Sequence, residues 1–555
     1  MIYLENEMND SENKNRGIAL DPQYKTLAKN AFFSIFLSYS TYIFTLLTSF
    51  LLARMISREE WAILILATSI IGIFSIIVNF LPPGVIFSMN FYIPRYRAKN
   101  EPLKLRNFIL DAFCIRIIII LAIFFIAIII FGLFESIYNV FLNSHIILLY
   151  ILAPLIIIQN LDAFFMTFLI GFNLFKTNFI LFLVKSGAKI SPLIVIFFLF
   201  GTINIETIAL INLISLVVPV IIELLIFIKK IPTVKSKEGN GLTFKKFFKK
   251  VIGYGSFLRI ENLVNSVWGE VQTVAIGTFE SSRWVTGNSI SKNYTNSSSR
   301  FLSSLTNPLI YSLSSLDYKK DYDKIIRMFR TIFKYSSYMF LFIIGILFFL
   351  SDFFLGFIYG DEYLEFVPLL KLMQISMVIS IYPMLFGLLL RSTNKIRLLA
   401  IMSLIFLPLH ILSVFIGLIN FGIYGMYFGV IIINIILLIC EFILTVKLLK
   451  VNLDLFKIIL QYLSFFIAIL ISIILGNLIF DDLSYQFWVN SSLPIFKHLN
   501  LINILVFVII FFILNIAFKT LAKTDLEYIE MLFTKDTISH KYINKFLHLF
   551  KRFLR

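Results

Sequence analysis

Residues 117–133 read IIIILAIFFIAIIIFGL, without a single charged side chain, and residues 502–518, INILVFVIIFFILNIAF, form a second run of this kind. A helix needs about 20 predominantly apolar residues to cross the hydrocarbon core of a bilayer, and both runs approach that length. The 555-residue chain is 59% hydrophobic and 15% charged, and its mean hydropathy is +0.90. Soluble domains carry about 25% charged residues. The sequence therefore predicts an all-α polytopic membrane protein.

Apolar runs and the charges between them predict about fourteen spans, arranged as two six-helix lobes plus two C-terminal helices. The expected spans are residues 31–53, 61–82, 108–132, 146–171, 178–200, 206–228, 250–277, 286–311, 332–356, 366–390, 397–418, 421–446, 456–480 and 500–519. The expected domains are a tail over 1–30, an N-lobe over 31–229, a basic interfacial linker over 230–250, a C-lobe over 251–446, the last two helices over 447–519 and a basic amphipathic tail over 520–555.

The distribution of positive charge predicts the orientation of these spans. On one side of the predicted membrane the connections hold only Arg54, Arg58, Arg283 and Lys497, and most of the 49 Lys and Arg residues lie in the connections on the other side. Cytoplasmic loops of membrane proteins are enriched in Lys and Arg, so both termini are expected in the cytoplasm and the protein in the plasma membrane. This topology accounts for the net charge of +17 without a nucleic-acid partner. Residues 1–29 are polar and lack the apolar segment of a cleaved signal peptide.

The sequence carries few signals of catalysis. Both cysteines, Cys114 and Cys440, lie in apolar runs, and HExxH, CxxC, Walker and GxSxG motifs are absent from the sequence. We therefore expect no cofactor, no metal and no catalytic residue. A membrane glycosyltransferase or polymerase is a weaker alternative, with Glu59–Glu60 or Asp481–Asp482 as external carboxylates, but the longest external connection, about 481–499, is too short for a domain.

The polar stretch 289–300, SISKNYTNSSSR, lies between two basic stretches, 235–250 and 319–330, that should both be cytoplasmic. The chain then crosses the membrane twice between them, which places the stretch inside the membrane. The alternative is a small cytoplasmic domain over 251–316. A transmembrane helix this polar must face protein or water. At about 100° per residue, one face carries Lys292, Thr295, Asn296, Ser299, Arg300, Ser303 and Asn307.

The preceding span repeats this pattern, with a polar stripe of Arg259, Asn262, Ser266, Glu270 and Thr273. Two neighbouring helices with cationic stripes indicate a water-filled, positively charged cavity. In the N-lobe a weaker stripe is formed by Ser34, Ser38, Thr41, Thr45 and Thr48. Hydroxyl groups at this spacing more often serve helix packing alone.

The fifth span contains VKSGAKISP, in which Lys185 and Lys189 are one helical turn apart near the middle of the membrane. A lysine at this depth costs several kcal/mol unless it is paired or hydrated. Asp162 of the fourth span is the expected partner of this pair, and Arg116 of the third span is a further candidate for the cavity. Two alternatives stay open: a buried Lys–Asp pair that only joins helices, and an Arg116 that extends to the cytoplasmic interface.

Two basic aromatic segments, TFKKFFKKVI (243–252) and KYINKFLHLFKRFLR (541–555), are expected to lie on the anionic cytoplasmic leaflet.

Several loose motifs occur in an order that resembles one transporter family. They are LLARMISREEWAILILATSI (51–70), PPGVIFSMNFYIPRYRA (82–98), IYGDEYLEFVPLLKLM (358–373), STNKIRLLAIMSL (392–404) and KTDLEYIE (523–530). The chain resembles the Wzx-like polysaccharide and oligosaccharide-lipid flippases of the multidrug/oligosaccharidyl-lipid/polysaccharide (MOP) transporter superfamily. The resemblance implies a MATE-like pair of six-helix bundles around a cavity, two extra helices, alternating access and a lipid-pyrophosphate-linked oligosaccharide as substrate.

The cavity residues themselves fit such a substrate. Arg and Lys suit a diphosphate, and Ser, Asn and Thr suit a glycan rich in hydroxyl groups. The expected partners are the lipid-linked oligosaccharide and membrane lipids, and partner polymerases or transferases leave no signal in the sequence. The alternative is an ion-coupled multidrug or cation exporter of the same superfamily, because Asp162, Glu223, Glu261, Glu270 and Glu441 lie within spans and leave room for coupling to H⁺ or Na⁺. Such an exporter should have more acids than cations in its cavity.

Overall fold

The computed structural model describes residues 22–82, 84–142, 144–232, 247–248, 251, 266–314, 322–392, 396–449, 455–480, 501–518 and 520. Over these ranges every regular element is a helix, which confirms the prediction of an all-α polytopic fold. In this part of the chain eight helices are long and apolar enough to cross a membrane, or nine if the bent pair Phe333–Phe349 and Ser351–Tyr359 forms one span. The number of fourteen spans stays a prediction.

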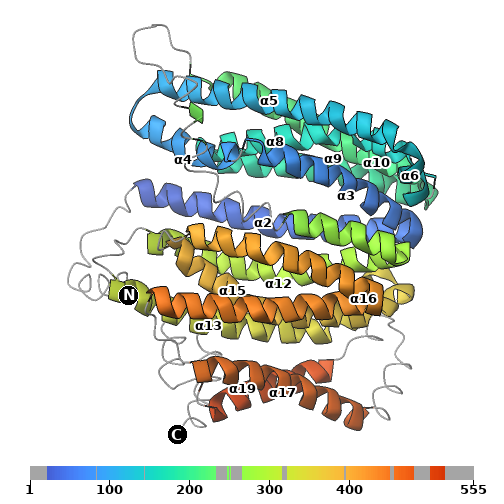
Figure 1. Cartoon of the computed structure of the whole chain (residues 1–555), viewed down its shortest axis with the longest axis vertical. Helices are drawn as coiled ribbons and strands as arrows, with labels where there is room; N and C mark the ends of the chain where they lie inside the picture. The colour runs from blue at the N-terminus through green and yellow to red at the C-terminus, as the bar shows by residue number, and fades with distance from the viewer. Residues whose placement is uncertain are drawn as a thin grey trace.

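The N-lobe occupies the upper half of Figure 1. Its helices are α2 (Pro22–Met55), α3 (Arg58–Phe80), α4 (Val85–Ala98), α5 (Pro102–Leu133), α6 (Glu135–Phe141), α7 (Ile147–Leu152), α8 (Leu155–Gly171), α9 (Phe175–Phe200) and α10 (Ile205–Lys230). The short helix α4 lies at the left end of the bundle, which is the predicted cytoplasmic end, and α6 lies at the right end (Figure 1). Helix α2 crosses the middle of the molecule, between the other N-lobe helices and the helices below it.

The C-lobe begins, in the described part of the chain, with a helix over residues 266–279. It continues through α12 (Ser282–Ser314), α13 (Tyr322–Phe349), α14 (Ser351–Phe353), the π-helical turn η1 (Phe354–Tyr359), the 3₁₀ turn η2 (Asp361–Phe366), α15 (Val367–Ser392) and α16 (Ile396–Leu449). Helices α17 (Leu455–Phe480) and α19 (Leu501–Ala517) pack on each other and on α13 at the bottom of Figure 1. Helix α12 packs against α3 and α15 inside the bundle, and nothing in this arrangement supports a small separate domain over 251–316.

Helix α16 combines two predicted spans, 397–418 and 421–446. Its backbone breaks at Gly422, with φ 64° and ψ −160°, two residues after the predicted connection at 419–420 and just inside the second predicted span. The two arms then approach so closely that a Cβ atom on Gly417 would lie 2.6 Å from the carbonyl carbon of Gly425. Glycine is required at this crossing because any side chain there would collide with backbone.

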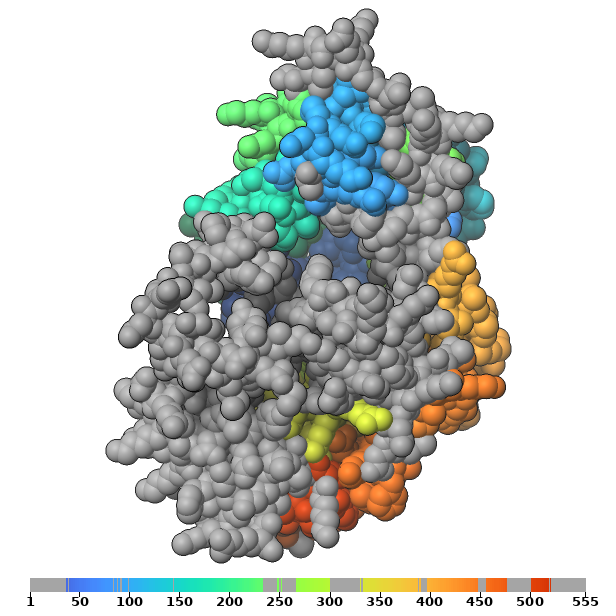
Figure 2. All heavy atoms as spheres, turned by 90° about the vertical axis from the view of Figure 1, so that its left-hand side faces the viewer, coloured from blue at the N-terminus to red at the C-terminus, as the bar shows by residue number. Residues whose placement is uncertain are grey.

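The two lobes are joined at the end of the molecule that is predicted to face outward. Trp61 of α3 stacks on Tyr359 at 6.3 Å between ring centroids, and the Arg58 guanidinium donates a hydrogen bond to the Glu365 carboxylate of η2. The Thr286 hydroxyl of α12 donates to the Arg58 carbonyl at 2.8 Å. The opposite face, seen in Figure 2, is hollowed between the lobes, and blue residues of the first helices show at the bottom of the hollow.

Candidate functional site

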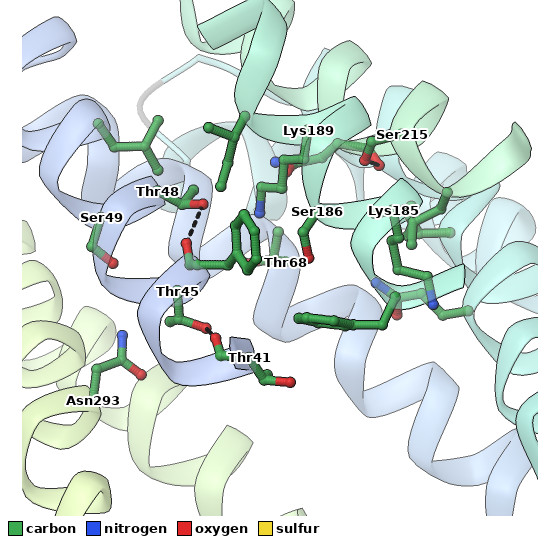
Figure 3. Close-up of a pocket in the computed structure, with 18 of the residues that line it drawn as sticks. Thr41, Thr45, Thr48, Ser49, Thr68, Lys185, Ser186, Lys189, Ser215 and Asn293 are labelled. Atoms are coloured by element: carbon green, nitrogen blue, oxygen red, sulfur yellow. Dashed lines mark hydrogen bonds between the residues drawn. The ribbon is translucent and has the colours of Figure 1, made fainter. Parts of the chain in front are cut away.

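A cavity of about 400 Å³ lies between α2, α3, α8, α9, α10 and α12, so both lobes contribute to its wall (Figure 3). Its polar lining is Thr41, Thr45, Thr48, Ser49, Thr68, Gln159, Lys185, Ser186, Lys189, Asn212, Ser215, Ser289 and Asn293, and its apolar lining is Phe44, Leu52, Trp61, Leu155, Phe182, Ile190 and Leu216. Among the described residues the lining therefore holds two lysines and no carboxylate. A polar cavity with excess positive charge attracts an anion.

The wall formed by α2 is a ladder of threonine hydroxyl groups. Thr41 donates to the Leu37 carbonyl at 2.7 Å, Thr45 to the Thr41 carbonyl at 2.7 Å, and Thr48 to the Phe44 carbonyl at 2.8 Å. These bonds satisfy each hydroxyl hydrogen within the helix, so the oxygen lone pairs remain to accept hydrogen bonds from a ligand or water. The sequence pattern favoured plain helix packing, whereas the structure places these three threonines at the cavity.

The structure brings together the predicted pair of Lys185 and Asp162. The Lys185 ammonium, from α9, donates to the Asp162 carboxylate of α8, and the side chains are 17% and 19% exposed. Lys189 follows one turn later on the same helix, and Figure 3 shows it pointing into the cavity from the side of α9. Both lysines are thus accessible from the cavity, and only Lys185 has an ion-pair partner among the described residues.

Arg116 lies elsewhere. It is 1% exposed and is not among the lining residues of the cavity. Its guanidinium donates to the Val78 carbonyl at 2.5 Å, to the Asn160 side-chain oxygen at 2.9 Å and to the Asn79 side-chain oxygen. Neutral oxygens from α3 and α8 therefore hold the Arg116 side chain in place. Arg116 joins α3, α5 and α8 and neither lines the cavity nor extends to the interface.

On the C-lobe side, α12 presents Ser289 and Asn293 to the cavity. Lys292, predicted as a cavity cation, lies instead close enough to Glu270 of the preceding helix for the two charges to attract. The Glu270 carboxylate in turn packs on α3, where a Cβ atom added to Gly72 would lie 2.9 Å from its Oε1 atom. Lys292 and Glu270 therefore stand at the contact between the lobes, beside the cavity wall.

The structure describes the remaining predicted residues only in part. Within α12 the Ser299 hydroxyl donates to the Asn296 carbonyl at 2.9 Å. Arg259 and Asn262 lie outside the described residues, and so do the side chains of Arg300, Ser303 and Asn307, whose backbone belongs to α12. Of the segment 243–252, Phe247 packs on Phe108 of α5 at 5.2 Å between ring centroids, and the segment 541–555 lies outside the described part. The roles of these residues stay predictions.

Comparison with known families decides what kind of protein this is. A family model described as "Polysaccharide biosynthesis protein" matches residues 27–307. The chain belongs to this family. The predicted kinship with the Wzx-like polysaccharide family is thereby confirmed. No curated protein sequence matches the chain.

Solved structures agree with this polysaccharide biosynthesis protein in fold. One is an inward-facing multidrug resistance MATE transporter of the MOP superfamily, with a TM-score of 0.60 and 13% identity over 75% of this chain and 99% of that one. A second is the lipid II flippase MurJ in an inward closed conformation, with a TM-score of 0.56 and 20% identity over 88% of this chain and 98% of that one. A third is a Vibrio cholerae MATE transporter, with a TM-score of 0.52 and 14% identity over 77% and 97% of the two chains. The MATE-like fold and the multi-pass membrane location are thereby confirmed.

Proposed function

We propose that this polysaccharide biosynthesis protein is a flippase of the plasma membrane. Its substrate would be an oligosaccharide linked through pyrophosphate to a polyprenyl lipid, moved from the cytoplasmic to the outer leaflet by alternating access. The observation that carries the proposal is the lining of the cavity, which combines Lys185 and Lys189 with hydroxyl and amide groups and, in the part of the chain that the structure describes, holds no carboxylate.

The chemistry of the lining matches the two polar parts of such a substrate. A lysine ammonium binds phosphate oxygens as a compact point charge through as many as three hydrogen bonds. The threonine ladder of α2, with Ser49, Ser186 and Asn293, offers acceptors and donors to sugar hydroxyl groups. The polyprenyl chain is as apolar as the bilayer, so it would stay in lipid while the headgroup crosses.

The arrangement of the lobes supports a state that loads from the cytoplasm. Contacts of Arg58 and Trp61 with η1 and η2 hold the predicted outer end closed, and the opposite face is hollowed (Figure 2). Release to the outer leaflet requires these contacts to break. An inside-negative potential moves an anion outward with about 2.3 kcal/mol per charge per 100 mV. A headgroup with two charges would gain roughly twice that amount, before any opposing movement of protons.

The competing functions fit the described residues less well. A cation exporter needs carboxylates free to bind the cation, whereas the Asp162 carboxylate is paired with Lys185. A glycosyltransferase would need external carboxylates free for chemistry, but the Glu60 carboxylate accepts a hydrogen bond from the Ser57 amide at 3.0 Å and caps α3. Glu60 therefore has a structural role.

The test is headgroup translocation in proteoliposomes that contain a fluorescent polyprenyl-pyrophosphate sugar, read as protection of the headgroup from an external quencher. Lys189→Gln should slow translocation at least tenfold, since it removes the cavity lysine that has no carboxylate partner among the described residues. Lys176→Gln is the matched control, because Lys176 is exposed in the first turn of the same helix and does not line the cavity. Wild-type protein that moves none of this lipid under an imposed potential or ion gradient would refute the proposal.

A further inference from the structure

A second carboxyl group lies behind the Lys185–Asp162 pair. Glu223 of α10 is 1% exposed and its carboxyl group is within hydrogen-bonding reach of the Asp162 carboxyl group. In the described part of the chain no N–H or O–H group donates to either oxygen of Glu223. Two carboxyl groups in contact, one of them without a donor, form a stable pair only when a hydrogen atom lies between them.

The charges around this pair do not balance without a proton. Helix α8 contributes Asp162 and α9 contributes Lys185, the two charged groups that act on Glu223 among the described residues. Lys189 is one turn further along α9, on the wall of the cavity. Helices α3 and α7 also pack on α10, but the charged residues of α3 lie in its first turn and α7 has none. Two carboxylates and one ammonium leave one negative charge in excess.

An uncompensated charge inside a membrane costs several kcal/mol. One proton held between the two carboxyl groups removes this cost and also supplies the missing donor. The O–H group of one carboxyl then donates to an oxygen of the other, while Lys185 balances the remaining charge. Asp162 and Lys185 are each partly exposed, so a proton can reach the pair through the water of the cavity.

We propose that Asp162 and Glu223 form a proton-binding site and that Lys185 couples its occupancy to the substrate headgroup. The proposal rests on the proposed function, because the Lys185 ammonium is shared between the Asp162 carboxylate and a pyrophosphate in the cavity. When the pyrophosphate draws the ammonium away, the carboxyl pair retains one proton and one negative charge. It then takes up a second proton from water, and a new O–H bond forms on the free carboxylate. Headgroup binding is therefore accompanied by net uptake of as much as one proton.

The sign of the linkage follows from this uptake. Because the complex holds more protons than the free protein, headgroup binding weakens as the pH rises, by as much as tenfold in Kd per pH unit for one full proton. Protonation of Asp162 conversely frees Lys185 and strengthens binding. A proton thus accompanies the headgroup outward and reduces the net negative charge that the membrane potential moves.

The first experiment detects the shared proton directly. Infrared difference spectra of the purified full-length protein, recorded during a pH titration, should contain the C=O stretch of a protonated carboxyl group. Glu223→Gln should remove that band and keep the fold, because its amide has nearly the same shape and supplies a donor to Asp162. Glu206→Gln is the matched control, since Glu206 lies in the first turn of the same helix, pairs with His145 at 3.1 Å and is not among the residues that line the cavity. Absence of the band in wild type would overturn the proposal.

The second experiment measures the coupling, with farnesyl pyrophosphate as the probe. Isothermal titration calorimetry in buffers of different ionisation enthalpy gives the protons taken up per probe bound, compared between variants at one pH. We expect uptake in wild type and Glu206→Gln, uptake that persists in Glu223→Gln because Asp162 can still bind a proton, and loss of uptake in Glu223→Gln combined with Asp162→Asn, whose Kd should no longer rise with pH. Equal uptake in all four proteins would refute the coupling and leave the flippase function intact. A probe that binds none of them would refute the headgroup site itself.

Discussion

One carboxylate takes part in two ion pairs at the outer end of the molecule. Glu365 of η2 accepts a hydrogen bond from Arg58 of α3 and lies 3.6 Å from an Arg283 guanidinium nitrogen. The Arg58 and Glu365 side chains are 26% and 32% exposed. Since Arg58 belongs to the N-lobe and Glu365 to the C-lobe, their ion pair must break when the outer end opens. Glu365→Gln is therefore expected to shift the equilibrium between the two states toward opening.

The size of the shift follows from the solvent exposure of these groups. Two unit charges about 4 Å apart attract by about 4 kcal/mol in an effective dielectric of 20, but exposed pairs retain only about 0.2–1 kcal/mol after side-chain ordering and screening. Glu365 contacts two guanidinium groups from a partly buried position. Arg283 belongs to the same lobe as Glu365, so only the contact with Arg58 breaks on opening. We expect a loss of about 1 kcal/mol, which changes the ratio of closed to open molecules roughly 5-fold.

Distances between spin labels report this ratio. The chain has two cysteines, Cys114 and Cys440, so a Cys114→Ser and Cys440→Ser background leaves room for labels. Val140 of α6 and Phe421 of α16 are 81% and 75% exposed and lie near the outer ends of the N-lobe and C-lobe, so Val140→Cys and Phe421→Cys report on the separation of the lobes. Double electron–electron resonance should give a longer-distance population that grows in Glu365→Gln.

The control is Glu59→Gln, because Glu59 lies in the same region, is exposed and forms no ion pair among the described residues. In a double-mutant cycle, Arg58→Gln combined with Glu365→Gln should open the molecule little more than either change alone. Distance distributions identical in wild type and Glu365→Gln would show that the hydrophobic contacts of Trp61 close the outer end, and the reasoning from the ion pair would be wrong.

Three further substitutions test the packing and the site. Arg116→Met should lower the free energy of unfolding by about 2–4 kcal/mol, because it leaves the buried oxygens of Val78 and Asn160 without a donor, and an unchanged melting temperature would contradict this. Gly72→Leu places a side chain on the Glu270 carboxylate, so it should destabilise the closed outer end and slow headgroup translocation without preventing membrane insertion. Thr45→Val keeps the shape of α2 and removes one hydroxyl of the cavity wall. We expect several-fold slower translocation of a sugar-bearing lipid at an unchanged melting temperature. Equal rates would show that the threonine hydroxyl groups do not bind the headgroup.

Much of the helical framework could be predicted, because each span is specified by its own apolar run. The break in α16 at Gly422 lies two residues after the connection that the sequence predicts between two spans. The pairing of Lys185 with Asp162 was predictable for a similar reason: a lysine at this depth needs a partner, and few acids lie in neighbouring spans. The contacts between Arg58 and Glu365 join residues 307 positions apart, and local periodicity carries no information about them.

The N-lobe stripe shows why the cavity itself was harder to predict. Thr41, Thr45 and Thr48 have the same spacing whether they face another helix or water, since each hydroxyl donates to its own backbone in either case. Only the neighbours decide between the two, and those come from α9 and α12. The role of Lys292 depended on the neighbours in the same way. The sequence predicts that Lys292 lies on the polar face of α12, but its proximity to Glu270 follows from the packing of two helices.

Arg116 and Lys185 show what distinguishes a structural cation from a functional one within this membrane protein. Arg116 is buried, and three neutral oxygens accept from its guanidinium, so a phosphate would have to compete with partners that the fold fixes in place. Lys185 has a single carboxylate partner, and its ammonium also faces the cavity. A proton can neutralise that carboxylate. The oxygens that accept from the Arg116 guanidinium are already neutral, so no proton can weaken those contacts in the same way. A cation with one titratable partner can therefore be transferred to a ligand at small cost, and this difference makes Lys185, rather than Arg116, the residue through which headgroup binding reaches Asp162 and Glu223.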